Sequence, residues 1–394
     1  MRSVRISGLG CTLLDFVYNA VDFNAEEFKN YCSNSPGDGG LTPGQLVFLE
    51  DLEKFAGQDF NTIISEIAGD REPDAFNVGG PAIVSIIHAA QLLGEKAEFQ
   101  VVASIGQDWI GQHILEILDK TPVSSNDFII QKSRTPFTNV LSDPNYSEGR
   151  GERTFINNIG AAGDICPKDL QENFFNTDIL ALGGTALVPC IHDGLDEILE
   201  RAGESTFKLV NTVFDFRNEQ KSPGNPWPLG RNHSSFSAID LLVMDHEEAL
   251  KISGMDSLDK AIKYYTESPL NAFIITDGTN PVTIYSNPEN YGEKGCLVSL
   301  PVFPEIFSSA NSGKLNGDTT GAGDNFVGGV IYSLARQFAD GCDLPDLAEA
   351  AEWGIVSGGF ACTYMGGTYL ENSPGEKLNA ITQYYQQYKE SNRQ

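Results

Sequence analysis

A glycine-rich run late in the chain ends in an acidic residue at the start of a helical pattern. Gly321 and Gly323 flank Ala322 just before Asp324, and apolar residues recur at helical spacing over residues 326–334. Such a turn directs unpaired backbone N–H groups and the positive end of a helix dipole at one point, which favours an anion such as phosphate. Glycine lets the backbone approach that anion, because a Cβ would obstruct it.

Asp324 lies in the first turn of this predicted helix, beside the predicted anion site. The dipole favours its ionised form, so the carboxylate is placed to take a proton from an attacking hydroxyl. Positioning and charge stabilisation account for most of the catalysis of phosphoryl transfer, so one base and one anion hole supply much of what is needed. Taken alone, the pattern fits a helix cap after a glycine loop equally well.

Short buried strands alternate with helical patterns along most of the chain. The predicted strands are residues 4–9, 99–104, 179–182, 208–213, 241–244 and 273–276. The predicted helices are residues 82–93, 109–118, 194–201, 247–252 and 258–265. This alternation predicts an α/β fold in which helices cover both faces of a mostly parallel central sheet.

Two segments depart from this alternation. The polar stretch of about 19–75 has too few apolar residues for a core of its own, so we interpret it as an insertion, with a helical pattern at 46–55, within a single domain spanning 1–394. Residues of about 134–160 flank a polar, glycine-bearing tip, which predicts a β-hairpin that projects as a small lid. The polar tail at 383–394 predicts a frayed helix.

The octapeptide at 317–324, Gly-Asp-Thr-Thr-Gly-Ala-Gly-Asp, strongly resembles the C-terminal signature of the PfkB (ribokinase-like) carbohydrate kinase family. Further blocks resemble that family in the same order: Gly8-Leu9-Gly10 with Asp15, Gly79-Gly80-Pro81-Ala82, residues 106–111, residues 149–163, Asp245-His246-Glu247-Glu248 and Thr276-Asp277-Gly278. The resemblance covers nearly the whole chain. It implies a ribokinase-like three-layer sandwich with a small β lid.

The resemblance also implies roles for particular residues. Asp324 would be the general base, and Gly321, Ala322 and Gly323 the anion hole. The substrate-binding residues would be Asp15, Gly79, Gly80 and Arg217. The ATP-binding residues would be Asp245, Glu248, Thr276, Gly278 and Thr320, with Glu248 also a magnesium ligand. ATP and Mg²⁺ would be the cofactors, and a monovalent cation such as K⁺ could bind beside Asp318.

Three positions weaken the correspondence. Val84 stands where the family usually has an asparagine, which removes an amide donor and acceptor from the pocket. Asp245 replaces the asparagine of an Asn-x-x-Glu block; it could favour a divalent metal or simply cap the next helix. Arg217 lies in a region that lacks the asparagine of the similar sugar-kinase segment, so a phosphate contact and a surface ion pair are both open.

These features predict an ATP-dependent kinase that transfers the γ-phosphate to a hydroxyl of a small sugar or sugar-like metabolite. A nucleoside kinase is an alternative, because residues 41–45 and the helical pattern after them resemble the adenosine-kinase branch. A non-catalytic ligand-binding relative is another. A dinucleotide-dependent oxidoreductase fits poorly, because Leu13 stands where the third glycine of its fingerprint belongs.

Composition limits the partners. The 394 residues carry a net charge of -28, a field that repels phosphate backbones and anionic headgroups, so we expect no nucleic-acid or membrane partner. The seven cysteines are scattered singly, so we expect no disulfide scaffold, no structural zinc site and a cytoplasmic location. Lids of this family often pair subunits, so a homodimer is plausible.

Overall fold

The central element of the chain is an eight-stranded sheet of order β15-β14-β13-β12-β11-β10-β1-β5. The structure is a computed structural model that describes residues 2–35, 37–149, 151–303, 306 and 319–392. The strands of the sheet are β1 (Val4–Gly10), β5 (Ala97–Val102), β10 (Ile179–Gly183), β11 (Phe207–Asn211), β12 (Leu241–Asp245), β13 (Ala272–Asp277), β14 (Asn280–Ser286) and β15 (Cys296–Leu300). The first six pair in parallel, which confirms the predicted parallel sheet, while β14 and β15 add an antiparallel edge that the sequence analysis missed.

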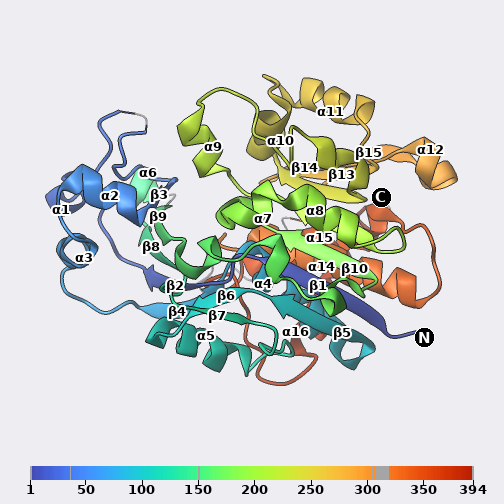
Figure 1. Cartoon of the computed structure of the whole chain (residues 1–394), viewed down its shortest axis with the longest axis horizontal. Helices are drawn as coiled ribbons and strands as arrows, with labels where there is room; N and C mark the ends of the chain where they lie inside the picture. Colours follow the sequence, from blue (N-terminus) through green and yellow to red (C-terminus); the bar gives the residue numbers. More distant parts are fainter. Residues whose placement is uncertain (1, 36, 150, 304–305, 307–318, 393–394) are drawn as a thin grey trace.

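Helices cover both faces of this sheet, as predicted (Figure 1). One layer comprises α4 (Pro81–Leu93), α14 (Ala322–Ala339), α15 (Leu347–Ala361) and α16 (Glu376–Ser391). The other comprises α7 (Pro189–Asp193), α8 (Leu195–Arg201), α10 (His246–Ser253) and α11 (Leu258–Glu267). Within β10, Ile179 and Ala181 join the first core while Leu180 and Leu182 join the second, so the strand is apolar throughout because it is buried on both faces.

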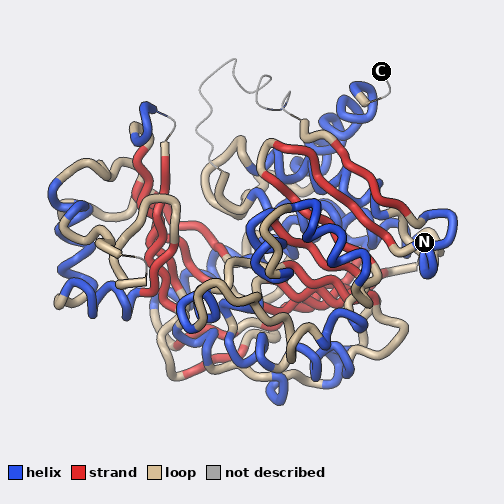
Figure 2. The backbone as a smooth tube through the Cα atoms, turned by 90° about the horizontal axis from the view of Figure 1, so that it is seen from above, coloured by secondary structure: helices blue, strands red, loops and turns tan. Residues whose placement is uncertain are grey.

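A second sheet of order β3-β9-β8-β2-β4 stands apart from the first, as the two groups of strands in Figure 2 show. Its strands are β2 (Leu13–Tyr18), β3 (Leu46–Phe48), β4 (Ala75–Gly79), β8 (Phe137–Asp143) and β9 (Glu152–Asn158). The antiparallel pair β8–β9 is the predicted hairpin. We call this whole five-stranded sheet the lid sheet.

The insertion belongs to the lid sheet, which the sequence analysis had reduced to the hairpin alone. Its helices are α1 (Glu26–Lys29), α2 (Leu49–Ala56) and α3 (Phe60–Ala68). The helix predicted over 46–55 is wrong at its start, because residues 46–48 form β3, which pairs in parallel with β9 before α2 begins. The other elements are β6 (Ser104–Gly106), β7 (Ile129–Gln131), α5 (Trp109–Leu118), α6 (Tyr146–Gly149), α9 (Phe216–Lys221) and α12 (Pro288–Tyr291).

The cysteines depart from the expected scattering at one place. A disulfide joins Cys166, just before a short 3-10 turn, to Cys190 in the first turn of α7. These residues are separated by 24 positions in the sequence, and the fold brings their Cα atoms to 5.0 Å. A single bridge is no scaffold, but spacing alone did not reveal it.

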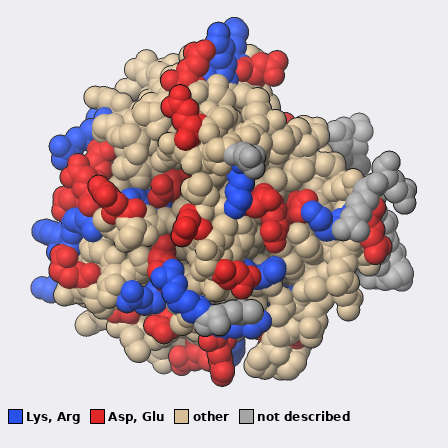
Figure 3. Space-filling model, turned by 90° about the vertical axis from the view of Figure 1, so that its right-hand side faces the viewer, with Lys and Arg blue, Asp and Glu red and all other residues tan. Residues whose placement is uncertain are grey.

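Acidic and basic side chains are mixed on the face of the molecule that Figure 3 draws. On the face in Figure 3, acidic and basic side chains are interspersed, so the net charge of -28 forms no single patch there. Among the residues that the structure describes, no helix has both the length and the apolar character needed to cross a membrane.

Candidate active site

A cavity between the lid sheet and the N-terminal end of α14 brings six of the predicted site residues together. It encloses about 520 Å³ of empty space, part of it open to solvent. Its lining includes the predicted residues Asp15, Gly79, Gly80, Thr320, Gly321 and Asp324. The same lining includes Leu13, Leu46, Pro81, Val84, Thr138, Phe155, Asn157, Leu187 and Gly367. Apolar side chains with a few convergent polar groups are the usual lining of a small-molecule site.

The glycine turn has the conformation that the sequence predicted. Gly321 is the N-cap of α14 with a φ of 71°, a left-handed conformation that favours glycine. An added Cβ at Gly321 would also lie 2.5 Å from the Cα of Gly367, so the two loops touch at this point. Ala322 and Gly323 then begin the helix, whose first-turn N–H groups lack acceptors within the helix. The Ala322 N–H instead donates to the Thr319 carbonyl at 3.2 Å. Gly317 and Asp318 of the motif lie outside the described residues.

Asp324 is half-buried in the first turn of α14. Its burial raises the pKa of the carboxyl to about 6. A carboxylate whose pKa lies near the pH of the solution is ionised often enough to accept a proton, and it is also basic enough to drive the transfer.

Asp15 faces the cavity from β2 and is buried, with 6% of its surface exposed. On the neighbouring strand β4, Asp15 pairs with Asn77 and Leu13 pairs with Gly79, so Gly79 lies diagonally across from Asp15. A Cβ added to Gly79 would lie 2.8 Å from the Asp15 Cγ and closer still to Oδ2, so only glycine leaves room for the carboxylate. Gly80 has a φ of 108° and packs against the Cys11 carbonyl, which again excludes a side chain. The paired glycines therefore fit the Asp15 side chain and a close approach of substrate to the backbone.

The lid sheet contributes polar groups that the sequence analysis did not assign. Asn157 Nδ2 donates to Thr138 Oγ1 at 2.8 Å, and both residues line the cavity. Arg153, on β9, donates to the hydroxyls of Thr319 and Thr320 at the start of the glycine turn. Arg153 lies within the block of residues 149–163 that resembles the family, but the sequence gave it no individual role. Only the fold shows that its guanidinium reaches the anion turn.

The predicted nucleotide residues gather at the carboxyl ends of two neighbouring strands. Asp245 and Thr276 are register partners at the ends of β12 and β13, and Gly278 follows in a turn with a φ of 56°. Ligands of open α/β sheets bind at this edge. Asp245 Oδ1 accepts from the Glu248 N–H at 2.8 Å, and Glu248 Oε2 accepts from the Asp245 N–H at 2.9 Å. The helix-capping alternative for Asp245 is thus confirmed as a geometric fact.

Glu248 is buried at the start of α10, and its carboxylate also accepts from the Thr212 hydroxyl at 2.6 Å. Burial, helped by the nearby charges of Asp245 and Asp324, raises the pKa of Glu248 to about 8. Because the charge of Asp324 contributes to the raised pKa of Glu248, the glycine turn and the predicted nucleotide site lie close enough for their carboxylates to interact. No cluster of three potential metal ligands occurs among the described residues.

Arg217 is not brought to this cavity. Its guanidinium forms a two-point ion pair with the Asp193 carboxylate, at 2.9 Å for Nη1, which is the surface alternative that the sequence left open. The helix that carries it, α9, instead meets the insertion. Phe216 packs against Phe48 with ring centroids 5.9 Å apart, and Gln220 Nε2 donates to Asp51 at 3.3 Å.

The overall architecture defines a ribokinase-like fold. An adenosine kinase from Schistosoma mansoni in complex with 2-fluoroadenosine superposes with a TM-score of 0.66 at 17% identity, covering 92% of this chain and 96% of that chain. A ribokinase from Thermotoga maritima superposes with a TM-score of 0.64 at 17% identity, covering 96% and 99%. Residues 74–373 match the pfkB family carbohydrate kinase description, and the chain belongs to that family.

Curated relatives are distant in sequence. The bifunctional protein HldE of Helicobacter pylori is 24% identical over 295 residues, covering 72% of this chain. The chain spans only 56% of that relative's length. A fructokinase from Vibrio alginolyticus is 24% identical over 323 residues, covering 77% of this chain and 91% of the fructokinase. Enzymes of the pfkB family are phosphotransferases with hydroxyl acceptors.

Proposed function

We propose that the chain is an ATP-dependent kinase that phosphorylates a hydroxyl of a small sugar or sugar-like metabolite. One observation carries this proposal: Asp15, Asp324 and the Gly321 turn line the same cavity. Hydroxyl binding, proton removal and charge stabilisation are therefore available to one small substrate. The family match is consistent with this activity.

Each group has a separate part in the reaction. Asp15 accepts hydrogen bonds from substrate hydroxyls and orients the molecule between the lid sheet and the body. Asp324 takes the proton of the hydroxyl that attacks the terminal phosphorus. The N–H groups of Gly321, Ala322 and Gly323 are the candidate anion hole, although that of Ala322 would first have to release the Thr319 carbonyl. The Arg153 guanidinium beside Thr320 adds positive charge at the turn.

The nucleotide would extend from the turn toward Asp245, Thr276 and Gly278. Mg²⁺ usually takes one or two carboxylates, with phosphate oxygens and water as its other ligands, so a single carboxylate at Glu248 fits it. Burial and the Asp245 carboxylate raise the pKa of Glu248, so a bound cation would favour its ionised form. When bound, the metal would neutralise phosphate charge. K⁺ beside Asp318 stays a proposal that concerns residues outside the described part.

A nucleoside is the second candidate substrate, because one wall of the cavity is apolar. Leu46 and Phe155, which are register partners on β3 and β9, line it together with Leu187. A polyol with a flat apolar substituent would place its hydroxyls on Asp15 and its ring on these side chains. A sugar alone would leave this wall uncovered.

The remaining expectations also stand as proposals. They are a single kinase domain, a cytoplasmic location and a possible homodimer. A lid-mediated homodimer would have to use a surface other than the one where Phe60 of α3 packs on Phe137 of the lid sheet, at 6.1 Å between ring centroids.

The test is ADP release from ATP with a panel of sugars and nucleosides, using wild type and Asp324→Asn. We expect Asp324→Asn to lower kcat by on the order of three decades, because the amide cannot accept the proton. Asp340→Asn, the same substitution at the opposite end of α14, is the matched control and should leave kcat unchanged. Near-normal turnover in Asp324→Asn would remove the assignment of the base.

A further inference from the structure

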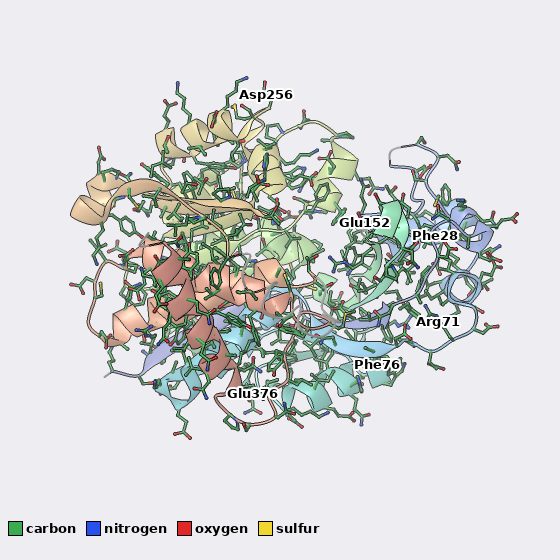
Figure 4. All side chains as sticks on the ribbon, turned by 180° about the vertical axis from the view of Figure 1, so that it is seen from behind. Phe28, Arg71, Phe76, Glu152, Asp256 and Glu376 are labelled. Atoms are coloured by element: carbon green, nitrogen blue, oxygen red, sulfur yellow. A yellow bond between two sulfur atoms is a disulfide. The ribbon has the colours of Figure 1, made fainter. Side chains whose placement is uncertain are left out.

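A lysine is buried beneath the catalytic end of α14. Lys377 lies in the first turn of α16 and has 1% of its surface exposed. Figure 4 places its neighbour Glu376, the first residue of α16, at the lower edge of the body, well away from Phe28 and Arg71 in the insertion. From that edge the Lys377 side chain extends into the core. Its Nζ donates to Gln91 Oε1 of α4 at 2.9 Å and to Asn325 Oδ1 of α14 at 3.4 Å.

Asn325 connects this lysine to the glycine turn. Asn325 follows Asp324 directly and is fully buried. Its Nδ2 donates at 2.8 Å to the Gly321 carbonyl and at 2.8 Å to the Gly367 carbonyl, the two loops that meet at the floor of the cavity. One amide therefore holds the anion turn against the neighbouring loop. Any group that fixes or polarises this amide acts on the turn.

Three donors converge on the other end of the same amide. Asn325 Oδ1 lies 2.6 Å from His88 Nδ1 and accepts from the Tyr364 hydroxyl at 3.2 Å, in addition to Lys377 Nζ. Because Oδ1 only accepts, His88 donates through Nδ1. His88 Nε2 is buried and has no hydrogen-bond partner among the described residues, which is consistent with a neutral ring. The lysine is then the only group in this set that can bring a full positive charge.

We propose that Lys377 is a positioning residue for phosphoryl transfer, whose ammonium, acting through Asn325, fixes the Gly321 turn in the geometry that binds the transferred phosphoryl group. This inference rests on the proposed kinase function and adds a residue with no contact to substrate. The path runs from Nζ to Asn325 Oδ1, and from Asn325 Nδ2 to the Gly321 carbonyl.

The energetics indicate that this lysine is not kept for stability. Burial lowers the pKa of Lys377 to about 7, against the smaller raising effect of Glu371. Between that value and the ordinary 10.5, the unfolded chain binds more protons than the folded chain, so folding stability from this group rises with pH across that window. At neutral pH and below, the buried ammonium therefore costs stability. Replacing a buried charge by an apolar group of similar volume is often neutral or stabilising, so stability does not account for an ammonium at this position.

The charged and titratable neighbours of Lys377 lie on α4 and on the segment that leads into α16. His88 faces it from α4, and the Tyr369 ring lies with its centroid 5.9 Å from Nζ. Glu371 accepts from the Lys377 backbone N–H at 2.8 Å. Asp324 is adjacent in sequence to Asn325 but lines the cavity.

These groups predict a narrow activity window. Asp324 must be ionised, so kcat/KM rises with pH through about 6. Lys377 must be protonated, so kcat/KM falls again as pH rises through about 7. The profile should be bell-shaped with its maximum between the two values.

The experiment compares wild type with Lys377→Met and Lys377→Gln, measuring kcat and KM by ADP release from pH 5 to 9 and the melting temperature of each variant. Methionine keeps the length of the side chain but has neither donor nor charge; glutamine restores a donor without charge. Lys389→Met, which removes a half-buried lysine of the same helix that pairs with Glu352 far from the glycine turn, is the matched control. We expect both Lys377 variants to lose about tenfold in kcat at pH 6.5 with little change in KM. Their kcat/KM should also no longer decrease as the pH rises through about 7. The melting temperature of Lys377→Met should be unchanged or higher.

The outcomes separate this inference from the proposed function. No ADP release by wild type with any acceptor overturns both. An active wild type whose falling limb persists in Lys377→Met overturns this inference alone. So does a Lys377→Met protein that loses kcat and melting temperature together while Lys377→Gln restores both, because that pattern describes a structural hydrogen bond.

Discussion

The contact between Gly79 and Asp15 offers a sharp test of substrate binding. Gly79 has no left-handed backbone conformation, so alanine there meets no backbone strain. Its Cβ would, however, lie 2.8 Å from the Asp15 Cγ and 2.9 Å from the Leu13 Cδ1. The leucine methyl can move aside, whereas the carboxylate is confined in the buried face of the sheet. Gly79→Ala should therefore displace the Asp15 side chain while leaving its identity intact.

The size of the effect follows from the hydrogen bonds that Asp15 would make. A hydrogen bond to a charged group contributes about 1.5–3 kcal/mol, and its loss leaves a substrate hydroxyl unsatisfied. Since about 1.4 kcal/mol corresponds to a factor of ten, losing one such bond lowers kcat/KM by about 10- to 100-fold. The added methyl would cost about 1–3 kcal/mol of stability, the usual range for overpacking.

The assay is a double-mutant cycle on kcat/KM with Gly79→Ala, Asp15→Ala and the combined variant. In the Asp15→Ala background the clashing carboxylate is gone, so Gly79→Ala should cost little more. Gly163→Ala is the control glycine, because its added Cβ would meet only Ile159 Cγ2 at an ordinary 3.5 Å. Additive losses in the double variant, or a Gly79→Ala enzyme within twofold of wild type, would refute the claim that Gly79 serves to place Asp15 against substrate.

Two further predictions concern the nucleotide end and the disulfide. Asp245→Asn keeps the hydrogen bond that caps the helix at the Glu248 N–H, so it should retain kcat. Asp245→Ala removes this cap and should cost about 1 kcal/mol of stability in thermal unfolding. An inactive Asp245→Asn would instead show that the carboxylate contacts metal or nucleotide. The double variant Cys166→Ala/Cys190→Ala should lower the free energy of unfolding in urea by about 3 kcal/mol, because the disulfide closes a loop with a sequence separation of 24. A wild-type protein whose urea midpoint is the same with and without reductant would contradict this prediction.

The sequence predicted the features that depend on local pattern. The six parallel strands were recognisable because each contains a short, largely apolar run, which in the central strand β10 is buried throughout. Their ends fall within one or two residues of the predicted ones. The glycine turn before Asp324 was recognisable because its backbone requirement can be met only by a particular residue type. In both cases the information lies within a dozen neighbouring residues.

Features that depend on distant pairing were not predictable in the same way. The strand β3 reads as the start of a helix until β9, more than a hundred positions later, provides its hydrogen bonds. Arg153 reaches Thr320 only because the lid sheet stands over α14. Lys377 lies in a polar helix whose composition indicates a surface position, yet its side chain is buried. A single residue in a tail helix carries no local signal of what it meets.

Val84 is a position where a local sequence feature and the distant pairing of the lid sheet must be considered together. Val84 is buried at the cavity floor, and its Cγ2 would lie 3.1 Å from a Cβ on Gly367, so the floor is closed by apolar packing and offers no side-chain amide. Polar recognition must then come from the lid sheet, where Asp15, Thr138 and Asn157 face the cavity. The same sheet carries Arg153, which touches the anion turn. A substrate that fixes the lid sheet over α14 would therefore fix the Arg153 guanidinium at the turn as well, so recognition and completion of the phosphate site depend on the same placement of one sheet.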